Sequence, residues 1–361
     1  MPRIHWRRKA ASYRQEMRLP LDPALPGRTS AIIMSRQGRS SIEPRLWASI
    51  DRVADLRAVQ LETRPGCREA VALLDDVDVV ASTNLCLPVL DAHLLDALPR
   101  LRAIVLYATG YDHIDVALLR ERGIGLSVLH GYATAAVAEQ GLAMLLALAT
   151  RLHLAHDRSR GVAPERASLR GVELEGKTVG VVGVGRIGSR LAEMCRGLRM
   201  RVVGTDIDRG AEAAARTSGV EMGSIDWLLG RSDAVVVCAS HSFSSPPIIG
   251  REELAAMRDG ALLVNVARSA LVDTAAATAA VRCGQLRGYA VDDAVLDPCA
   301  DGDLLAEGRV LQTGHSAWWR DEVLERGARM WGEHLLAAIH GTPLDAVTWP
   351  QVSRTAAGSL T

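Results

Sequence analysis

The chain has 361 residues, which is too long for one ordinary hydrophobic core and favours two domains of roughly 150 to 200 residues each. Hydrophobic residues make up 48% of it, charged residues 23%, and the formal net charge is zero, a composition typical of globular rather than disordered, fibrous or membrane proteins. A neutral chain gives no electrostatic reason to expect a nucleic-acid or membrane partner, and we expect neither.

Cysteine spacing and the longest apolar stretch exclude further classes. The six cysteines form no CxxC pair and no cluster with histidines, so we expect neither a metal site nor a disulfide framework, and a cytoplasmic location. The apolar stretch 137–148 contains Glu139 and Gln140 and is shorter than the ~20 residues that cross a bilayer. Residues 1–29 are basic and proline-rich without the apolar centre of a secretory signal, which predicts a disordered extension.

Short apolar runs of strand type alternate with amphipathic helical stretches from residue 31 onward. The first series lies at 31–35, 58–62, 77–81 and 101–106, and the second at 178–182, 201–205, 234–238, 261–265 and 288–291. Strands that alternate with helices predict parallel sheets covered on both faces. The fold class we expect is therefore α/β, with two doubly wound parallel sheets.

Two longer helical patterns set the expected domain boundaries. The stretch 136–153 is apolar on all sides, which predicts a helix buried at a domain junction. The stretch 321–340 predicts a terminal amphipathic helix that returns to the first domain. We therefore expect an extension at 1–29, a first domain at 30–135 and 320–350, and a second domain at 136–319.

A glycine-rich turn follows the strand run at 178–182. In this GxGxxG turn Gly183 permits a tight bend, Gly185 lets the backbone approach a pyrophosphate, and Gly188 lets the next helix pack on the strand. Asp206 closes the following strand run, where a carboxylate binds ribose hydroxyls and repels a 2′-phosphate. The combination predicts a dinucleotide site that prefers NAD over NADP, with Arg209 close enough to temper the preference.

Three further segments carry polar residues just beyond predicted strands, at 265–273, 292–298 and 313–319. In an open parallel sheet, residues past the carboxyl ends of the strands line the ligand crevice. An arginine in the first segment offers a planar fork that matches a keto-acid carboxylate and polarises its carbonyl. A histidine in the last segment can give and take a proton near neutral pH.

These motifs, in this order, resemble the D-isomer-specific 2-hydroxyacid dehydrogenase family over about residues 77–346. Tyr111-Asp112-His113-Ile114-Asp115 and Val137-Ala138-Glu139 belong to the same resemblance. It implies an NAD-dependent oxidoreductase that interconverts a small 2-keto acid and its D-2-hydroxy acid in a cleft between two Rossmann-like or flavodoxin-like domains. It also implies a homodimer, a substrate-binding first domain and an NAD-binding second domain.

The resemblance assigns roles to individual residues. Arg268 anchors the substrate, His315 is the general acid/base, and Asp297 is the carboxylate partner of His315, with Asp293 a second candidate because the family usually has Glu at 297. The implied cofactor-binding residues are Gly183, Gly185, Arg186, Ile187, Gly188, Asp206, Ala239, Ser240, Val266, Ala267 and Asp292. The implied substrate-binding residues are Ala108, Thr109, Gly110 and Trp318, although packing on the terminal helix is an equal alternative for Trp318.

Three departures from the family pattern, besides the aspartate at 297, allow a reduced or specialised activity. Ser269 stands where the family usually has glycine, and His241 and Gly314 stand where it usually has proline. The segment from His315 to Trp319 is similar to one in the C-terminal-binding-protein corepressors, so an NAD(H)-responsive binding protein is the rival interpretation.

Two other branches of the family are weaker alternatives. A phosphite or phosphonate-type dehydrogenase is disfavoured because that branch relies on a lysine where this chain has Thr109. Formate oxidation is disfavoured because that branch pairs its histidine with glutamine, whereas this chain offers a carboxylate.

Overall fold

The computed structural model describes residues 28–241, 246–293 and 295–350, so nearly all of the extension expected at 1–29 lies outside the described residues. The chain divides into two units. The described part of unit 1 consists of residues 28–107, 116–128 and 331–350, and that of unit 2 consists of residues 108–115 and 129–330 without the gaps.

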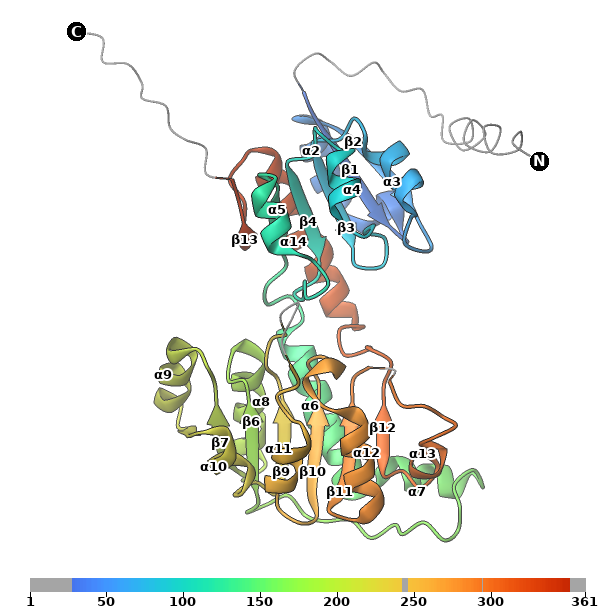
Figure 1. The fold of residues 1–361 in the computed structure, drawn as a ribbon, viewed down its shortest axis with the longest axis vertical. Coiled ribbons are helices and arrows are strands. Elements are labelled where there is room, and N and C mark those ends of the chain that lie inside the picture. The colour runs from blue at the N-terminus through green and yellow to red at the C-terminus, as the bar shows by residue number, and fades with distance from the viewer. Residues whose placement is uncertain (1–27, 242–245, 294, 351–361) are drawn as a thin grey trace. The chain divides into compact units, whose positions relative to one another are not determined.

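Unit 1 is built on a six-stranded sheet with the strand order β13-β5-β4-β3-β1-β2 (Figure 1). All neighbouring strands are parallel except β13, which is antiparallel to β5. The strands are β1 (Thr29–Ser35), β2 (Ala54–Gln60), β3 (Val79–Thr83), β4 (Ala103–Tyr107), β5 (Gly125–Val128) and β13 (Ala346–Thr348). The helices are η1 (Gly38–Ser41), α2 (Pro44–Asp51), α3 (Cys67–Leu74), α4 (Ala92–Asp96) and α5 (Val116–Glu121).

Helix α14 (Asp321–Ile339) contributes its second half to unit 1. Trp331 is fully buried, and its indole N–H donates to the Val105 carbonyl at 3.1 Å. The same ring meets the Tyr107 ring edge-on, with centroids 5.2 Å apart. A buried tryptophan whose N–H has a partner fixes the second half of α14 on β4.

Unit 2 is built on a seven-stranded, fully parallel sheet with the strand order β12-β11-β10-β9-β6-β7-β8. The strands are β6 (Thr178–Val182), β7 (Arg201–Thr205), β8 (Glu221–Met222), β9 (Ala234–Val237), β10 (Ala261–Asn265), β11 (Leu286–Val291) and β12 (Val310–Gln312). The chain runs outward from β6 to β8, then returns to β9 and runs the other way. Ligands of open parallel sheets bind at such a switch point, beyond the carboxyl ends of the strands.

Helices cover both faces of this sheet (Figure 1). One core is formed with α6 (Thr134–Thr150), α8 (Arg186–Gly197) and α9 (Arg209–Thr217). The other is formed with α10 (Ile225–Leu229), α11 (Arg251–Ala256), α12 (Thr274–Cys283) and α13 (Gly302–Ala306). Helix α7 (Leu152–Ser159) and the short η2 (Ser269–Leu271) complete the unit.

The expected fold class is confirmed, with α/β units and doubly wound, mainly parallel sheets. The expected helix at 136–153 is wrong in detail, because Arg151 has a φ of 59° and ends α6 before α7 begins. No single helix among the described residues is long and apolar enough to cross a membrane, and only the bent pair α6 and α7, taken together, passes that test of length and composition.

Candidate functional site

The glycine turn between β6 and α8 has the geometry of a phosphate cradle. Gly183 has a φ of 89°, and a Cβ there would lie 2.5 Å from the Ala239 Cα. A Cβ on Gly188 would lie 2.0 Å from the Gly183 carbonyl oxygen, so the helix can pack on the turn only without a side chain. A Cβ on Gly185, the residue before α8, would meet no atom within 4 Å. That space, at the amino end of a twelve-residue helix with free N–H groups, fits a pyrophosphate.

Asp206 ties the glycine turn to the next strand. One carboxylate oxygen accepts the Val184 amide at 2.8 Å, and the other accepts the Asp208 amide at 2.9 Å. Each oxygen of a carboxylate has about two acceptor positions, so both can still accept a ribose hydroxyl. Asp206 is therefore held in place by the turn it would serve.

The remaining expected cofactor residues lie around the same carboxyl edge of the sheet. Arg186 and Ile187 begin α8, Ala239 and Ser240 follow β9, and Val266 and Ala267 follow β10. The Ala267 amide donates to the Asn265 side chain at 3.0 Å, which fixes the turn after β10. The topology of unit 2 thus brings these segments to one edge, and their contact with a dinucleotide stays a prediction.

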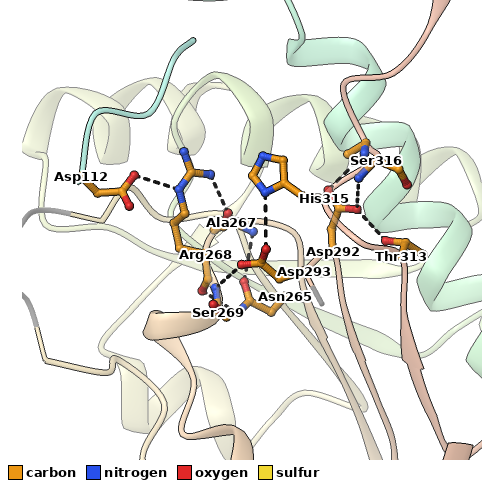
Figure 2. A network of polar contacts seen from close by, with 11 residues as sticks. Asp112, Asn265, Ala267, Arg268, Ser269, Asp292, Asp293, Thr313, His315 and Ser316 are labelled. Carbon is orange, nitrogen blue, oxygen red and sulfur yellow. Dashed lines mark hydrogen bonds and ion pairs between the residues drawn. The ribbon is translucent and has the colours of Figure 1, made fainter. Parts of the chain in front are cut away.

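Arg268, directly after this turn, is held by a carboxylate that sequence reasoning left without a role. Its Nε donates to Asp112 at 2.8 Å, and one terminal nitrogen donates to the Ala267 carbonyl at 2.9 Å (Figure 2). Burial opposes ionisation of Asp112, but the charge and hydrogen bond of Arg268 outweigh it, so the pKa of Asp112 lies below its ordinary value. His241 Nδ1 lies 4.0 Å from the other oxygen of Asp112.

The expected substrate loop lies against the same guanidinium. A Cβ on Gly110 would lie 1.6 Å from Arg268 Nη2, so only glycine permits this approach. Ala108 is buried, and the Thr109 hydroxyl donates to the Leu129 carbonyl at 2.7 Å. The loop thus presents backbone, rather than side chains, to Arg268.

His315 is paired with Asp293, not with Asp297. His315 Nδ1 lies 3.5 Å from Asp293 Oδ1, while Nε2 points away from that carboxylate (Figure 2). The other oxygen of Asp293 accepts the Ser269 amide at 3.2 Å. The hydrogen bond from His315 is the largest cause that lowers the Asp293 pKa from 3.8 to about 2, against the opposing effect of burial.

Strand register explains why Asp293 takes this place. Val291 at the end of β11 is paired with Gln312 at the end of β12, so residues just beyond the two strands lie side by side. Asp297 is exposed, and its carboxylate accepts the Cys299 amide at 2.8 Å in the turn before α13. The expected pairing with Asp297 is therefore not the one in the structure, and the second candidate, Asp293, occupies the position.

Asp292 organises the segment that carries His315. This buried carboxylate accepts the Thr313 hydroxyl at 2.5 Å and the amides of Ser316 and Ala317 at 3.0 and 3.1 Å (Figure 2). The resemblance implies that Asp292 binds the cofactor, but three protein donors already occupy most of its acceptor positions. The structure thus gives Asp292 a positioning contact that the sequence did not reveal.

Backbone conformation also sets the place of His315. Gly314 has a φ of 65° and His315 a φ of 58°, so two successive residues are left-handed. Proline, with φ fixed near about −65°, cannot occupy the first of these positions. This backbone thus excludes the usual family proline at 314 and favours the glycine that replaces it.

Trp318 and Trp319 follow on the same segment. Their rings meet edge-on at 5.0 Å, Trp318 is half-buried, and Trp319 is 58% exposed.

Among the described residues, no group of three or more His, Cys, Asp or Glu side chains could hold a metal ion.

Comparisons with known proteins place this site in a family. Residues 142–317 match the family described as D-isomer specific 2-hydroxyacid dehydrogenase, NAD binding domain. The chain is 34% identical to a glyoxylate reductase of Thermococcus kodakarensis, over 73% of this chain and 81% of that protein. It is 31% identical to a D-3-phosphoglycerate dehydrogenase of Archaeoglobus fulgidus, over 73% of this chain, and spans about half of that relative's length.

A solved structure agrees with these sequence matches. The D-lactate dehydrogenase of Aquifex aeolicus, complexed with NAD and lactic acid, superposes with a TM-score of 0.70 at 25% identity, over 86% of this chain and 96% of that one. The expected family and the expected cofactor, NAD, are both confirmed. The chain belongs to the D-isomer specific 2-hydroxyacid dehydrogenase family.

Proposed function

We propose that this chain is an NAD-dependent oxidoreductase that interconverts a small 2-keto acid and its D-2-hydroxy acid. The observation that carries the proposal is the position of Asp293, which accepts the amide that follows Arg268 with one oxygen and faces His315 with the other. One carboxylate thus joins an anion-binding guanidinium to a proton donor. These are the two groups that reduction of a keto-acid carbonyl requires.

Arg268 would bind the substrate carboxylate and polarise the carbonyl. Nε is engaged by Asp112 and one terminal nitrogen by the Ala267 carbonyl, whereas Nη2 has no hydrogen-bond partner within the described residues and lies against Gly110. An oxyanion placed between Nη2 and the backbone of the loop Ala108 to Gly110 would satisfy both. Asp112 would keep the guanidinium in that orientation.

His315 would hold and move the proton. With Nδ1–H directed at Asp293, Nε2 faces away from the pair and can protonate the carbonyl oxygen during reduction or deprotonate the hydroxyl during oxidation. Asp293 stabilises the charged imidazolium and selects the tautomer. The nicotinamide, when bound, supplies or accepts the hydride.

A substrate panel tests this proposal directly. Purified protein with NADH would be assayed on glyoxylate, pyruvate and 3-phosphohydroxypyruvate, chosen because relatives are named as glyoxylate reductases and D-3-phosphoglycerate dehydrogenases. We expect NADH oxidation with at least one of them, and His315→Ala should abolish it while NADH binding remains. Turnover unaffected by His315→Ala would contradict the assignment.

The rival function, NAD(H)-responsive binding without turnover, has one observation in its favour. Trp319 exposes 58% of its surface on the segment that carries His315, as a residue that docks on a partner protein would. Absence of turnover on the whole panel, combined with tight NADH binding, would favour this function over the enzyme.

Location and assembly complete the proposal. All six cysteines are free, which agrees with a reducing cytoplasm. We also propose a homodimer, as the resemblance implies, and sedimentation of the full chain at several concentrations measures it. A single monomeric species throughout would contradict the dimer.

A further inference from the structure

A basic pocket lies in unit 2, away from the candidate site. Its volume is about 370 Å³, within the range of roughly 300 to 1,000 Å³ typical of small-molecule sites. Its charged lining consists of a single carboxylate and five guanidinium groups, namely Glu307, Arg151, Arg166, Arg170, Arg287 and Arg309. An excess of one charge in one pocket is unfavourable unless an anion compensates it.

The pocket and the candidate site lie at opposite ends of the strands β11 and β12. Arg287 is the second residue of β11 and Arg309 directly precedes β12, so both stand at the amino ends of these strands. Asp293 and His315 follow the carboxyl ends of the same two strands. Asp293 lies six positions beyond Arg287 along the direction of β11, roughly 20 Å at the usual rise per residue. The pocket therefore cannot be part of the candidate site.

Arg151 is the buried centre of the pocket lining. It is 6% exposed, and its two terminal nitrogens donate to the carbonyls of Gly308 and Glu307 at 2.8 and 2.6 Å. Its Nε is buried and has no hydrogen-bond partner among the described residues. Burial, followed by the charges of Arg287 and Arg309, lowers the pKa of Arg151 below its ordinary value. The protein thus retains a buried cation that its neighbours destabilise.

Backbone and carbonyl contacts hold the arginines in place without neutralising them. Arg287 donates to the Arg170 carbonyl at 2.7 Å, and Arg309 donates to the Val281 carbonyl. The one carboxylate in the lining, Glu307, is engaged by Arg166, with 3.3 Å between Nε and the nearer oxygen. Guanidinium groups fixed by carbonyls are pre-organised for a tetrahedral oxyanion, because little side-chain freedom is lost on binding.

We propose that this pocket is a binding site for a phosphate group, either free phosphate or a small phosphate monoester. Arginine forks match phosphate oxygens in geometry as well as charge. Arg151, Arg287 and Arg309 would contact the group from inside the pocket, and Arg170 would close on it from the exposed segment between α7 and β6.

Isothermal titration of the full chain tests the site. Inorganic phosphate and glycerol 2-phosphate would be titrated separately at constant ionic strength, with NADH saturating so that the glycine turn is filled. We expect saturable binding at one site, and tighter binding of one titrant would identify free phosphate or a monoester as the better ligand. Absence of saturable binding with both would overturn the proposal.

Three variants locate the binding. Arg170→Gln and Arg287→Gln should each weaken it roughly tenfold, as expected when one charged hydrogen bond is lost. Arg251→Gln, the same change at an exposed residue that does not line the pocket, should leave it unchanged. Among the described residues the Arg170 side chain has no hydrogen-bond partner, so its variant tests the site even if Arg287→Gln lowers stability. Wild-type affinity in Arg170→Gln and Arg287→Gln would refute the assignment.

Sedimentation separates a small anion from a protein partner. If phosphate does not bind and Arg170→Gln converts a dimer to a monomer, carboxylates of a second copy fill the pocket and the proposal is wrong. Phosphate binding is also independent of turnover, so a failure on every keto acid would count against the proposed enzyme and not against this site.

Discussion

Replacing Asp293 separates the two carboxylates that could serve His315. Asp293→Asn keeps the shape of the side chain and removes its charge. Asp297→Asn is a matched control, because within the described part of the chain that carboxylate accepts a single hydrogen bond, from the nearby Cys299 amide. The first change should impair reduction of the keto acid, because it removes the anion that stabilises the imidazolium. The second should alter the rate less than about twofold, as expected for an exposed surface substitution.

The size of the effect follows from the pair itself. Lowering the pKa of Asp293 from 3.8 to about 2 corresponds to about 2 kcal/mol in favour of the carboxylate, a net value in which His315 is the largest contribution and Ser269 and burial also take part; taken as an upper bound for the pair, it is about thirtyfold in rate. Water screens the pair, since the side chains of His315 and Asp293 are 47% and 26% exposed, and about 1 kcal/mol is the more realistic value. We therefore expect kcat/KM for reduction to fall by between about fivefold and about thirtyfold at neutral pH.

NADH binding distinguishes this effect from a loss of structure. NADH affinity, measured by fluorescence, should not change in either variant. A loss of NADH affinity in Asp293→Asn, or a larger loss of kcat/KM in Asp297→Asn than in Asp293→Asn, would show that the pair in the structure is not the working one.

Four further predictions concern the surrounding residues. Arg268→Lys should raise KM for the keto acid by about tenfold or more with unchanged NADH affinity, because a point charge cannot replace the fork; a change in NADH affinity alone would contradict the proposed role. Gly188→Ala should lower Tm because its Cβ would meet the Gly183 carbonyl. Gly185→Ala should leave Tm unchanged and weaken NADH binding. The reverse pattern in melting and fluorescence experiments would refute the phosphate cradle. Asp292→Asn should lower kcat because the amides of Ser316 and Ala317 lose their anionic acceptor, and wild-type kcat would show that these bonds do not position His315. Because the pKa of Asp293 is lowered on folding, its charge stabilises the protein above about pH 4, and this contribution should disappear between about pH 4 and about pH 2. The free energies of unfolding of wild type and Asp293→Asn, measured with urea, should therefore differ at about pH 5 and converge towards about pH 2.

The central strands could be predicted because a strand that is buried on both faces consists of a continuous run of apolar residues. The runs at 178–182, 201–205 and 261–265 coincide with β6, β7 and β10. Edge strands leave a weaker signal: β8 has two residues, and β12 and β13 have three each. No apolar run marks such strands, because their pairing depends on neighbours that are distant in the sequence. The break between α6 and α7 at Arg151 could not be predicted for a similar reason, since a left-handed arginine has no local sequence signal.

The candidate site shows the same limit at the level of single contacts. Motif order selected Arg268 and His315 as candidates, because each residue follows the carboxyl end of a strand. It could not identify the partner of His315, which depends on the register between β11 and β12 rather than on spacing along the chain. The link between Asp112 and Arg268 joins residues 156 positions apart, and only the fold brings them together.

Gly314 connects the local sequence to this non-local geometry. A proline before the histidine would fix φ near about −65°, whereas this chain has a φ of 65° at Gly314 and of 58° at His315. Glycine adopts this conformation without strain, but a left-handed histidine is strained unless its surroundings hold it, and here the three donors bound by Asp292 do so. The imidazole therefore leaves the backbone in a direction set by Gly314 and is received by the carboxylate nearest to that direction, which is Asp293. In this chain, therefore, Gly314 and Asp293 set the position of His315, in place of the usual family proline and the carboxylate at 297.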